Sequence, residues 1–304
     1  MKQKQILVIG GSYFIGRVFC LFATQTSSYH LHVVNRGKYT LNLPHTTQYI
    51  CGRHDTQRLS HLFPDIHFDS IVDFCAYSPG DIGEIFSALA GKFDHYIYLS
   101  SCSVYAPSTA AHREASPMRQ GSPSDPAEQY AYDKLTLEHE LQEACQAAAI
   151  PYTILRPSFV YGPYNYAPRE SYYVQLISQG GVIPVPQGAQ AQWQFVYVKD
   201  VAKGILACLE HPSCHDQDYI LSAPEIFTYP AFMDVLEQVS GQALLKNPVS
   251  LAQVYEQNIP LPFPLEQNEL YAGSKISSEL GLSYTPFLEG FSKTYAAFAK
   301  VFSK

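Results

Sequence analysis

The chain has 304 residues, enough for one large domain or two domains with a substantial core. Only 15% of the residues are charged and 46% are hydrophobic, a composition that excludes an intrinsically disordered chain. The net charge of -7 and the scarcity of lysine and arginine runs argue against nucleic acid as a main partner.

Targeting and metal signals are weak. No apolar run approaches the roughly 18 residues of a membrane span, and the N-terminal run is too short for a signal peptide. We therefore expect a cytoplasmic protein with no membrane partner. The seven cysteines are scattered, without a CxxC pair, and are interpreted as reduced core thiols. Cys208, Cys214 and His215 are the nearest approach to a ligand cluster, and no metal is predicted.

Strand-like apolar runs alternate with helical patterns through the first half of the chain. This alternation predicts βαβ units and an α/β fold with a Rossmann-type, doubly wound parallel sheet. The predicted strands are Ile6 to Ile9, His32 to Val34, Tyr49 to Cys51, Ser70 to Phe74, Tyr96 to Leu99 and Tyr152 to Leu155. The predicted helices begin near Phe14, Thr56, Pro79 and Ala127.

The second half is less regular. A Pro/Ser/Ala-rich stretch, 106 to 129, is either a linker or a functional loop that follows a strand. Later, "QFVYVKDVAKGILACLEH" predicts a strand, an N-cap at Asp200 and a helix, as if the sheet domain returned late in the chain. We therefore predict a Rossmann domain, and a smaller, discontinuous C-terminal substrate domain. Their predicted bounds are 1 to 160 plus about 192 to 222, and about 161 to 191 plus 223 to 304.

The segment "ILVIGGSYFIGR", Ile6 to Arg17, predicts a strand, a tight glycine turn and a helix. The free N-H groups and positive dipole end of such a helix suit a phosphate anion. Dinucleotide-binding turns of this type carry three spaced glycines, yet Tyr13 stands where one variant has the middle one. A tight turn without any ligand is the alternative.

The second strand ends in Asn35 and Arg36, where an NAD site usually places an acidic residue on the ribose 2'-hydroxyl. An arginine at this point, with Arg17 from the first helix, suits a 2'-phosphate instead. The cofactor is therefore predicted to be NADP or NAD, with NADP favoured. Alternatively, both arginines are ordinary solvent-exposed residues.

Tyr130 and Lys134 are four residues apart and share one face of a predicted helix. A lysine near a phenol favours the phenolate, which makes a general acid/base. The helix follows a strand that ends in Ser100-Ser101, at the carboxyl edge of the sheet. Tyr271 and Lys275 have the same spacing but lie far from any such strand, and we interpret them as structural.

Seven motifs together carry a family resemblance. They are "GGSYFIGR", "VVNRG", "FDSIVDFCAY", "YLSSCSVYAP", "YAYDK", "LRPSFVYGP" and "FVYVKDVAKGILACLE". In this order they resemble extended short-chain dehydrogenases/reductases of the NAD-dependent epimerase/dehydratase family, especially the GGxxFIG branch of chloroplast stem-loop-binding-like proteins. In that branch a bulky residue occupies the position of Tyr13 while the nucleotide site persists.

The resemblance implies roles for individual residues. Ser101 matches the residue that hydrogen-bonds the reacting oxygen, Tyr130 matches the acid/base, and Lys134 matches the lysine that holds the nicotinamide ribose. These three are the predicted catalytic residues. The predicted cofactor-binding residues are Gly10, Ser12, Tyr13, Phe14, Ile15, Gly16, Asn35, Arg36, Cys75, Ala76, Ser100, Tyr130, Lys134 and Pro157.

Some positions depart from the family pattern. Cys102 and Ser103 take the places of the Asp-Glu pair that dehydratases use, so net loss of water is not expected. After the third strand, the acidic residue that is usual in the family is absent, and Arg53 stands near its position. This puts an adenine contact in doubt.

Near the expected domain junction, Arg169 suits a diphosphate, and Trp193 or Tyr166 suits stacking on a base or sugar. Together with Ser101 they form the predicted substrate site. The alternative is that the aromatic residues pack the junction and Arg169 lies on the surface.

The resemblance implies an NAD(P)-dependent epimerase or reductase that transfers a hydride reversibly on a nucleotide sugar or a related hydroxyl or ketone substrate. The alternative is a nucleotide-binding, RNA-associated protein of the stem-loop-binding type with little catalysis. A homodimer is left open as its assembly.

Overall fold

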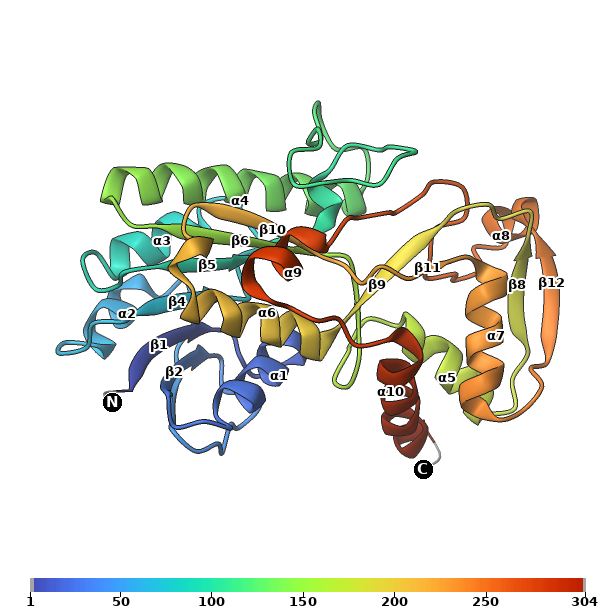
Figure 1. The fold of residues 1–304 in the computed structure, drawn as a ribbon, viewed down its shortest axis with the longest axis horizontal. Helices are drawn as coiled ribbons and strands as arrows, with labels where there is room; N and C mark the ends of the chain where they lie inside the picture. The colour runs from blue at the N-terminus through green and yellow to red at the C-terminus, as the bar shows by residue number, and fades with distance from the viewer. Residues whose placement is uncertain (1–2, 303–304) are drawn as a thin grey trace.

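A seven-stranded, wholly parallel sheet forms the larger lobe of the computed structural model, which describes residues 3–302 (Figure 1). The strand order is β10-β6-β5-β4-β1-β2-β3. The strands are β1 (Lys4–Ile9), β2 (Tyr29–Asn35), β3 (Thr46–Ile50), β4 (Ser70–Asp73), β5 (Tyr96–Leu99), β6 (Tyr152–Pro157) and β10 (Gln217–Leu221).

Helices cover both faces of this sheet. One face carries α1 (Phe14–Ala23) and α6 (Val198–Glu210), which pack against each other. The other carries α2 (Thr56–Leu62), α3 (Asp81–Ala88) and α4 (Pro126–Ala148). Ile6 and Val8 of β1 join the core under α1 and α6, whereas Leu7 and Ile9 join the core under α2 to α4. Burial of both faces explains why β1 is a continuous apolar run in the sequence.

Strand β1 lies between β2 and β4, so the chain winds away from it in two directions. At such a switch point the two neighbouring connections diverge and leave a crevice outside the carboxyl ends of the strands. The crevice therefore lies beyond Ile9, Asn35 and Asp73. This position is where the candidate site is found.

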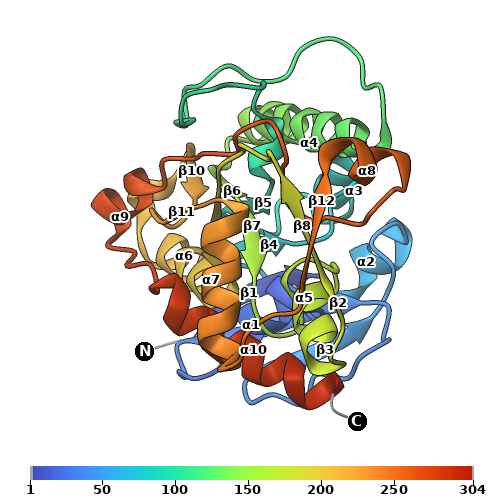
Figure 2. The same ribbon diagram turned by 90° about the vertical axis from the view of Figure 1, so that its right-hand side faces the viewer.

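The smaller lobe packs beside the carboxyl edge of the sheet (Figures 1 and 2). It contains two small sheets, β11-β9-β7 and β12-β8. Their strands are β7 (Phe159–Tyr161), β8 (Ile183–Gln187), β9 (Trp193–Tyr197), β11 (Ile226–Phe227) and β12 (Lys246–Ser250). Its helices are α5 (Glu170–Ser178), α7 (Tyr229–Ser240), α8 (Leu251–Glu256) and α10 (Phe287–Phe302), while α9 (Ser274–Leu280) lies against β10 and α6.

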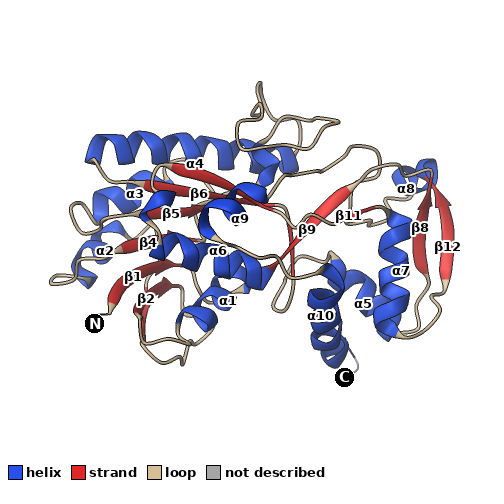
Figure 3. Ribbon diagram, viewed as in Figure 1, coloured by secondary structure: helices blue, strands red, loops and turns tan. Residues whose placement is uncertain are grey.

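The predicted strands of the first half are all present, and the predicted doubly wound α/β fold is confirmed. The stretch 106 to 129 is a long loop, with the first residues of α4 at its end, that rises above the sheet (Figure 3). It is tied back by bridges from Tyr105 to Met118 and from His112 to Tyr271. Among residues 3–302, no helix combines the length and the apolar character that crossing a membrane requires.

The prediction for Asp200 was wrong. Helix α6 begins at Val198, two residues earlier, and the Asp200 side chain is fully buried inside the helix. Its carboxylate accepts hydrogen bonds from the backbone N-H (2.6 Å) and hydroxyl (2.8 Å) of Thr285. The carboxylate oxygens that would cap the helix are therefore bonded to Thr285, in a distant segment of the chain. The preceding strand, β9, pairs with β7 and β11, and β10 is the late strand of the large sheet.

Two helical glycines give a matched stability test. A Cβ atom on Gly16 would lie 2.8 Å from the backbone of Gly11, whereas a Cβ on Gly83 meets no atom within 4 Å. We expect Gly16→Ala to lower the free energy of unfolding by about 1 to 3 kcal/mol because of this overlap. Gly83→Ala should raise it by roughly 0.5 to 1 kcal/mol. Urea denaturation measures both, and equal effects would contradict the tight packing of the first turn.

Candidate active site

A cavity of about 560 Å³ occupies the crevice at the carboxyl ends of β1, β2 and β4. Its walls come from the turn between β1 and α1, the segments after β2, β3 and β4, and one residue of the smaller lobe, Tyr166. The lining residues that matter below are Gly10, Ser12, Tyr13, Phe14, Ile15, Gly16, Asn35, Arg36, Lys38, Tyr39, Arg53, His54, Cys75, Tyr77 and Tyr166.

The turn after β1 brings backbone close to this cavity. Gly10 has a φ of +106°, and a Cβ there would lie 2.5 Å from the Sγ of Cys75. Gly11, with a φ of +70°, and Gly16 are equally crowded. Tyr13 has an extended backbone and 47% of its side chain surface is exposed, so its ring leaves the turn instead of filling it. The bulky residue is therefore compatible with a phosphate-binding turn.

The end of β2 carries unpaired positive charge. The Oδ1 of Asn35 accepts hydrogen bonds from the Gly37 N-H (2.8 Å) and from Gln48 (2.9 Å), so this side chain holds the turn. Arg36 and Lys38 are exposed and line the cavity. Among residues 3–302, no Asp or Glu lines this cavity. Arg17 does not join them, because its guanidinium lies 5.1 Å from the ring centroid of Tyr164.

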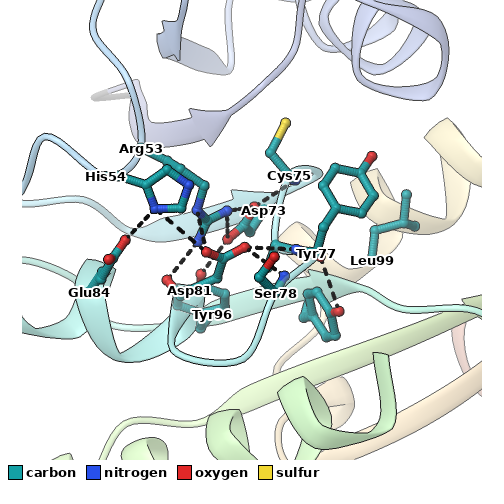
Figure 4. Close-up of polar contacts among 12 residues, drawn as sticks. Arg53, His54, Asp73, Cys75, Tyr77, Ser78, Asp81, Glu84, Tyr96 and Leu99 are labelled. Carbon is teal, nitrogen blue, oxygen red and sulfur yellow. Dashed lines mark hydrogen bonds and ion pairs between the residues drawn. The ribbon is translucent and has the colours of Figure 1, made fainter. Parts of the chain in front are cut away.

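Arg53 has a role in organising the loop after β4 (Figure 4). Its guanidinium donates to both carboxylate oxygens of Asp73, each at 3.1 Å, and to the backbone oxygen of Asp81 at 2.6 Å. The Asp81 carboxylate in turn accepts the N-H groups of Tyr77 and Ser78. The arginine is nearly buried, with 9% of its side chain exposed. It therefore fixes the loop from 73 to 81 along the cavity wall.

Lys134 reaches this loop from α4. The side chain is buried, and its Nζ donates to the carbonyl oxygens of Ala76 and Leu99, each at 2.9 Å. Burial lowers the pKa of Lys134 to about 8, although the nearby Asp73 carboxylate acts in the opposite direction. The Nζ lies 4.8 Å from the ring centroid of Tyr77 and 5.9 Å from that of Tyr130. The ring centroid of Tyr98 is also 4.8 Å away, so three tyrosine rings surround this cation.

Tyr130 and Ser101 meet at the same end of the crevice. Burial raises the pKa of Tyr130, and hydrogen bonding with the Ser101 side chain lowers it in part. The Ser101 hydroxyl oxygen also accepts the N-H of Ser103 at 3.1 Å and its hydroxyl at 2.9 Å. The three residues predicted to be catalytic are therefore brought together, from β5 and α4.

Five residues predicted to bind the cofactor do not line the cavity, namely Ala76, Ser100, Tyr130, Lys134 and Pro157. The Ser100 side chain is buried and donates to Glu138 at 2.5 Å. Pro157 ends β6 inside the large sheet, and Ala76 faces Lys134 through its carbonyl oxygen. Strand alternation explains Ser100, because neighbouring residues at a strand end point to opposite sides and Ser101 takes the crevice side.

The residues predicted to bind substrate separate in the structure. Tyr166 lines the cofactor cavity. The positive charge of Arg169 lowers the pKa of Tyr130, which indicates that Arg169 faces the catalytic end. Trp193 is fully buried, with its ring stacked on Phe263 at 5.1 Å, so neither a base nor a sugar can stack on it. The Trp193 side chain is part of the aromatic core of the smaller lobe.

Sequence reasoning missed Glu269, which no local motif marks. One of its oxygens accepts a hydrogen bond from the Tyr271 hydroxyl. Burial raises the pKa of Glu269, while Arg119 and Arg169 lower it. Its negative charge also raises the pKa of Cys102, next to Ser101. Glu269 comes from the segment between α8 and α9, which reaches the catalytic end only in the folded chain.

The fold and this Ser, Tyr and Lys set define an extended short-chain dehydrogenase/reductase. More specifically, the chain belongs to the NAD dependent epimerase/dehydratase family, whose model matches residues 6–222. The family predicted from the sequence motifs is thus confirmed.

Individual relatives are distant. The chain is 25% identical, over 259 residues, to the chloroplast stem-loop binding protein of 41 kDa b from Arabidopsis thaliana. That match covers 79% of this chain and 64% of the relative, so the chain spans less than two thirds of that protein. It is 24% identical to UDP-glucose 4-epimerase of Vibrio cholerae, over 72% of this chain and 70% of that one.

Solved structures share the fold. The UDP-glucuronic acid 4-epimerase of Bacillus cereus, in complex with UDP-glucuronic acid and NAD, superposes with a TM-score of 0.80 at 20% identity. The match covers 98% of this chain and 99% of that one. UDP-glucose 4-epimerase of Thermus thermophilus, in complex with NAD, gives a TM-score of 0.75 at 18% identity, over 97% and 98% of the two chains.

The buried charge of Lys134 predicts a pH dependence. Its pKa is about 8 in the folded protein and 10.5 ordinarily, so between pH 8 and 10.5 the unfolded chain binds more protons. Stability from this group therefore rises with pH across that window, by on the order of 3 kcal/mol. Urea unfolding at pH 7.5 and pH 10 measures the free energy of unfolding of both proteins. From pH 7.5 to pH 10, that of the wild type should increase relative to that of Lys134→Met.

Lys300→Met, at an exposed lysine of α10, controls for the loss of a lysine. If the difference between wild type and Lys134→Met does not change with pH, folding does not lower the pKa of Lys134.

Proposed function

We propose that the protein is an NAD(P)-dependent epimerase or reductase that acts by reversible hydride transfer on a nucleotide sugar or a related hydroxyl or ketone substrate. The observation that carries this proposal is the meeting of Ser101, Tyr130 and Lys134 beside a glycine-lined crevice at the switch point of the sheet. Family membership and the epimerase relatives support it.

The crevice fits a nicotinamide dinucleotide. A Cβ at Gly10, Gly11 or Gly16 would collide with neighbouring atoms, so only glycines allow this tight turn. The turn leads into the N-terminus of α1, which suits a diphosphate. A nicotinamide held there would supply the acceptor and donor of the hydride. The exposed positive charges of Arg36 and Lys38, which follow β2 and line the cavity, support the proposal that a 2'-phosphate binds there and that NADP is preferred.

The protein's own contribution is proton transfer and orientation. Tyr130 takes the proton from the substrate hydroxyl, and Ser101 holds that hydroxyl by a hydrogen bond. Burial raises the pKa of Tyr130, and the Ser101 hydrogen bond and the charge of Arg169 act against it. We assign the ammonium group of Lys134, 5.9 Å from the Tyr130 ring centroid, the same direction of effect during the reaction. Glu269 has one oxygen bonded to Tyr271, and we assign the other to a hydroxyl of the substrate.

The two residues after Ser101 do not supply an acid and a base for dehydration. Cys102 is buried, its thiol donates to the carbonyl oxygen of Arg156 at 3.1 Å, and burial raises the pKa of the thiol well above its usual range. The Ser103 hydroxyl donates to Ser101. Neither residue can protonate a leaving hydroxyl near neutral pH. The expected product is an epimer, or an alcohol and ketone pair.

Product analysis with a panel of UDP-sugars and NAD or NADP tests this function. Tyr130→Phe keeps the ring but removes the ionisable oxygen, so turnover should fall by at least about 100-fold while cofactor affinity stays within about threefold. Tyr132→Phe, two residues along α4, should retain turnover because its hydroxyl bonds Gln120 outside the crevice.

NMR and mass spectrometry in deuterated solvent identify the products. A product 18 mass units lighter, with deuterium next to a new carbonyl, would refute the reaction class. Equal turnover by Tyr130→Phe and wild type would refute the assignment of Tyr130.

The NADP preference has its own test. Loss of a charged hydrogen bond costs about 1.5 to 3 kcal/mol, so Arg36→Ala should weaken NADPH binding by roughly 10- to 150-fold. NADH binding should change little, because NADH has no 2'-phosphate. Calorimetric titration measures both, with Arg58→Ala on α2 as a surface control. A wild type that binds NADH tenfold more tightly than NADPH would overturn the preference.

A further inference from the structure

Three tyrosine rings form a continuous stack at the cofactor cavity. The centroids of Tyr39 and Tyr13 are 5.3 Å apart with an interplanar angle of 7°. Those of Tyr13 and Tyr166 are 5.1 Å apart with an angle of 16°. All three residues line the cavity. Tyr13 sits between its two neighbours and is in contact with both.

The stack joins the two lobes. Tyr39 follows β2 and Tyr13 precedes α1, both in the larger lobe, whereas Tyr166 belongs to the loop between β7 and α5 in the smaller lobe. The Tyr166 ring also meets Phe14 edge-on, with centroids 6.1 Å apart. Tyr166 of the smaller lobe, which is 60% exposed, therefore packs on the turn between β1 and α1.

The loop that carries Tyr166 is held in position on both sides of this residue. Arg17 lies 5.1 Å from the Tyr164 ring centroid, which ties the loop to α1. The Nδ2 of Asn165 donates to both carboxylate oxygens of the buried Glu170, each at 3.0 Å. The Gly162 N-H donates to the same carboxylate at 3.1 Å. These contacts present Tyr166 to Tyr13.

Tyr166 stands between the two ends of the site. It stacks on the turn at Tyr13, and its phenol also raises the pKa values of Tyr77 and Tyr130 at the catalytic end. A dinucleotide that extends from Arg36 to Tyr130 must cross this turn. A ligand in this cavity therefore lies against the three tyrosines that line it.

We propose that Tyr39, Tyr13 and Tyr166 form an aromatic clasp over the cofactor site, which parts for a nicotinamide dinucleotide to enter and closes to retain it. Tyr166 is thereby a cofactor-retaining residue supplied by the smaller lobe. This inference rests on the proposed function only for the identity of the cofactor and is independent of the substrate.

Stopped-flow fluorescence of bound NADPH and NADH tests the clasp through rate constants, without any substrate. Tyr166→Ala removes one ring contact, so dissociation should accelerate about three- to tenfold and association should also accelerate. Tyr166→Phe keeps the ring and should behave as wild type. Tyr255→Ala, an exposed tyrosine of α8 whose hydroxyl bonds Glu266, is the matched control.

The outcomes separate this inference from the proposed function. Unchanged rates in Tyr166→Ala, or equal changes in Tyr166→Phe, would refute the clasp while cofactor binding stands. A wild type that binds neither dinucleotide would overturn both proposals. Faster exchange in Tyr166→Ala without turnover of any UDP-sugar would support the clasp and count against the proposed substrate class.

Discussion

The ion pair between Arg53 and Asp73 connects the two ends of the site. Asp73 ends β4 with its side chain fully buried, and it accepts hydrogen bonds from Arg53, from the Tyr96 hydroxyl at 2.7 Å and from the Cys75 N-H at 2.7 Å. Loss of one partner from a buried pair costs about 3 to 5 kcal/mol because the remaining charge is uncompensated. The loop after β4 depends on this pair.

That loop supplies both one wall of the cavity and the support for Lys134. Cys75 packs against Gly10, so the glycine turn and the loop shape each other. One residue later, the Ala76 carbonyl oxygen receives Lys134. The next residue, Tyr77, places its ring 4.8 Å from the Lys134 ammonium. Arg53 thus fixes the loop that makes both contacts.

A second buried ion pair holds α4 in register with the sheet. Glu138 is one helical turn after Lys134 and accepts two hydrogen bonds from Arg156 of β6, at 2.9 and 2.7 Å. The same carboxylate accepts the Ser100 hydroxyl at the end of β5. Because these bonds fix the rotation of α4, Tyr130 and Lys134 face the crevice. Ser100, which was predicted to contact the cofactor, therefore helps to hold α4 against the sheet.

The sequence by itself determined the fold class, the strands of the first half and the family, because a parallel sheet covered on both faces leaves long apolar runs and because the motifs are local. It also marked Ser101, Tyr130 and Lys134, whose spacing along one strand end and one helix is a local property.

Only the tertiary structure decided what depends on contacts between distant segments. Asp200 has the sequence of a cap but binds Thr285, 85 residues away. A tryptophan is suited to stacking on a ligand, but the Trp193 ring stacks on Phe263 in the core. Glu269 and Tyr166 come from loops of the smaller lobe and reach the site only because that lobe packs beside the sheet edge. Local propensity carries no information about such partners, since burial and charge pairing arise only when the chain is folded.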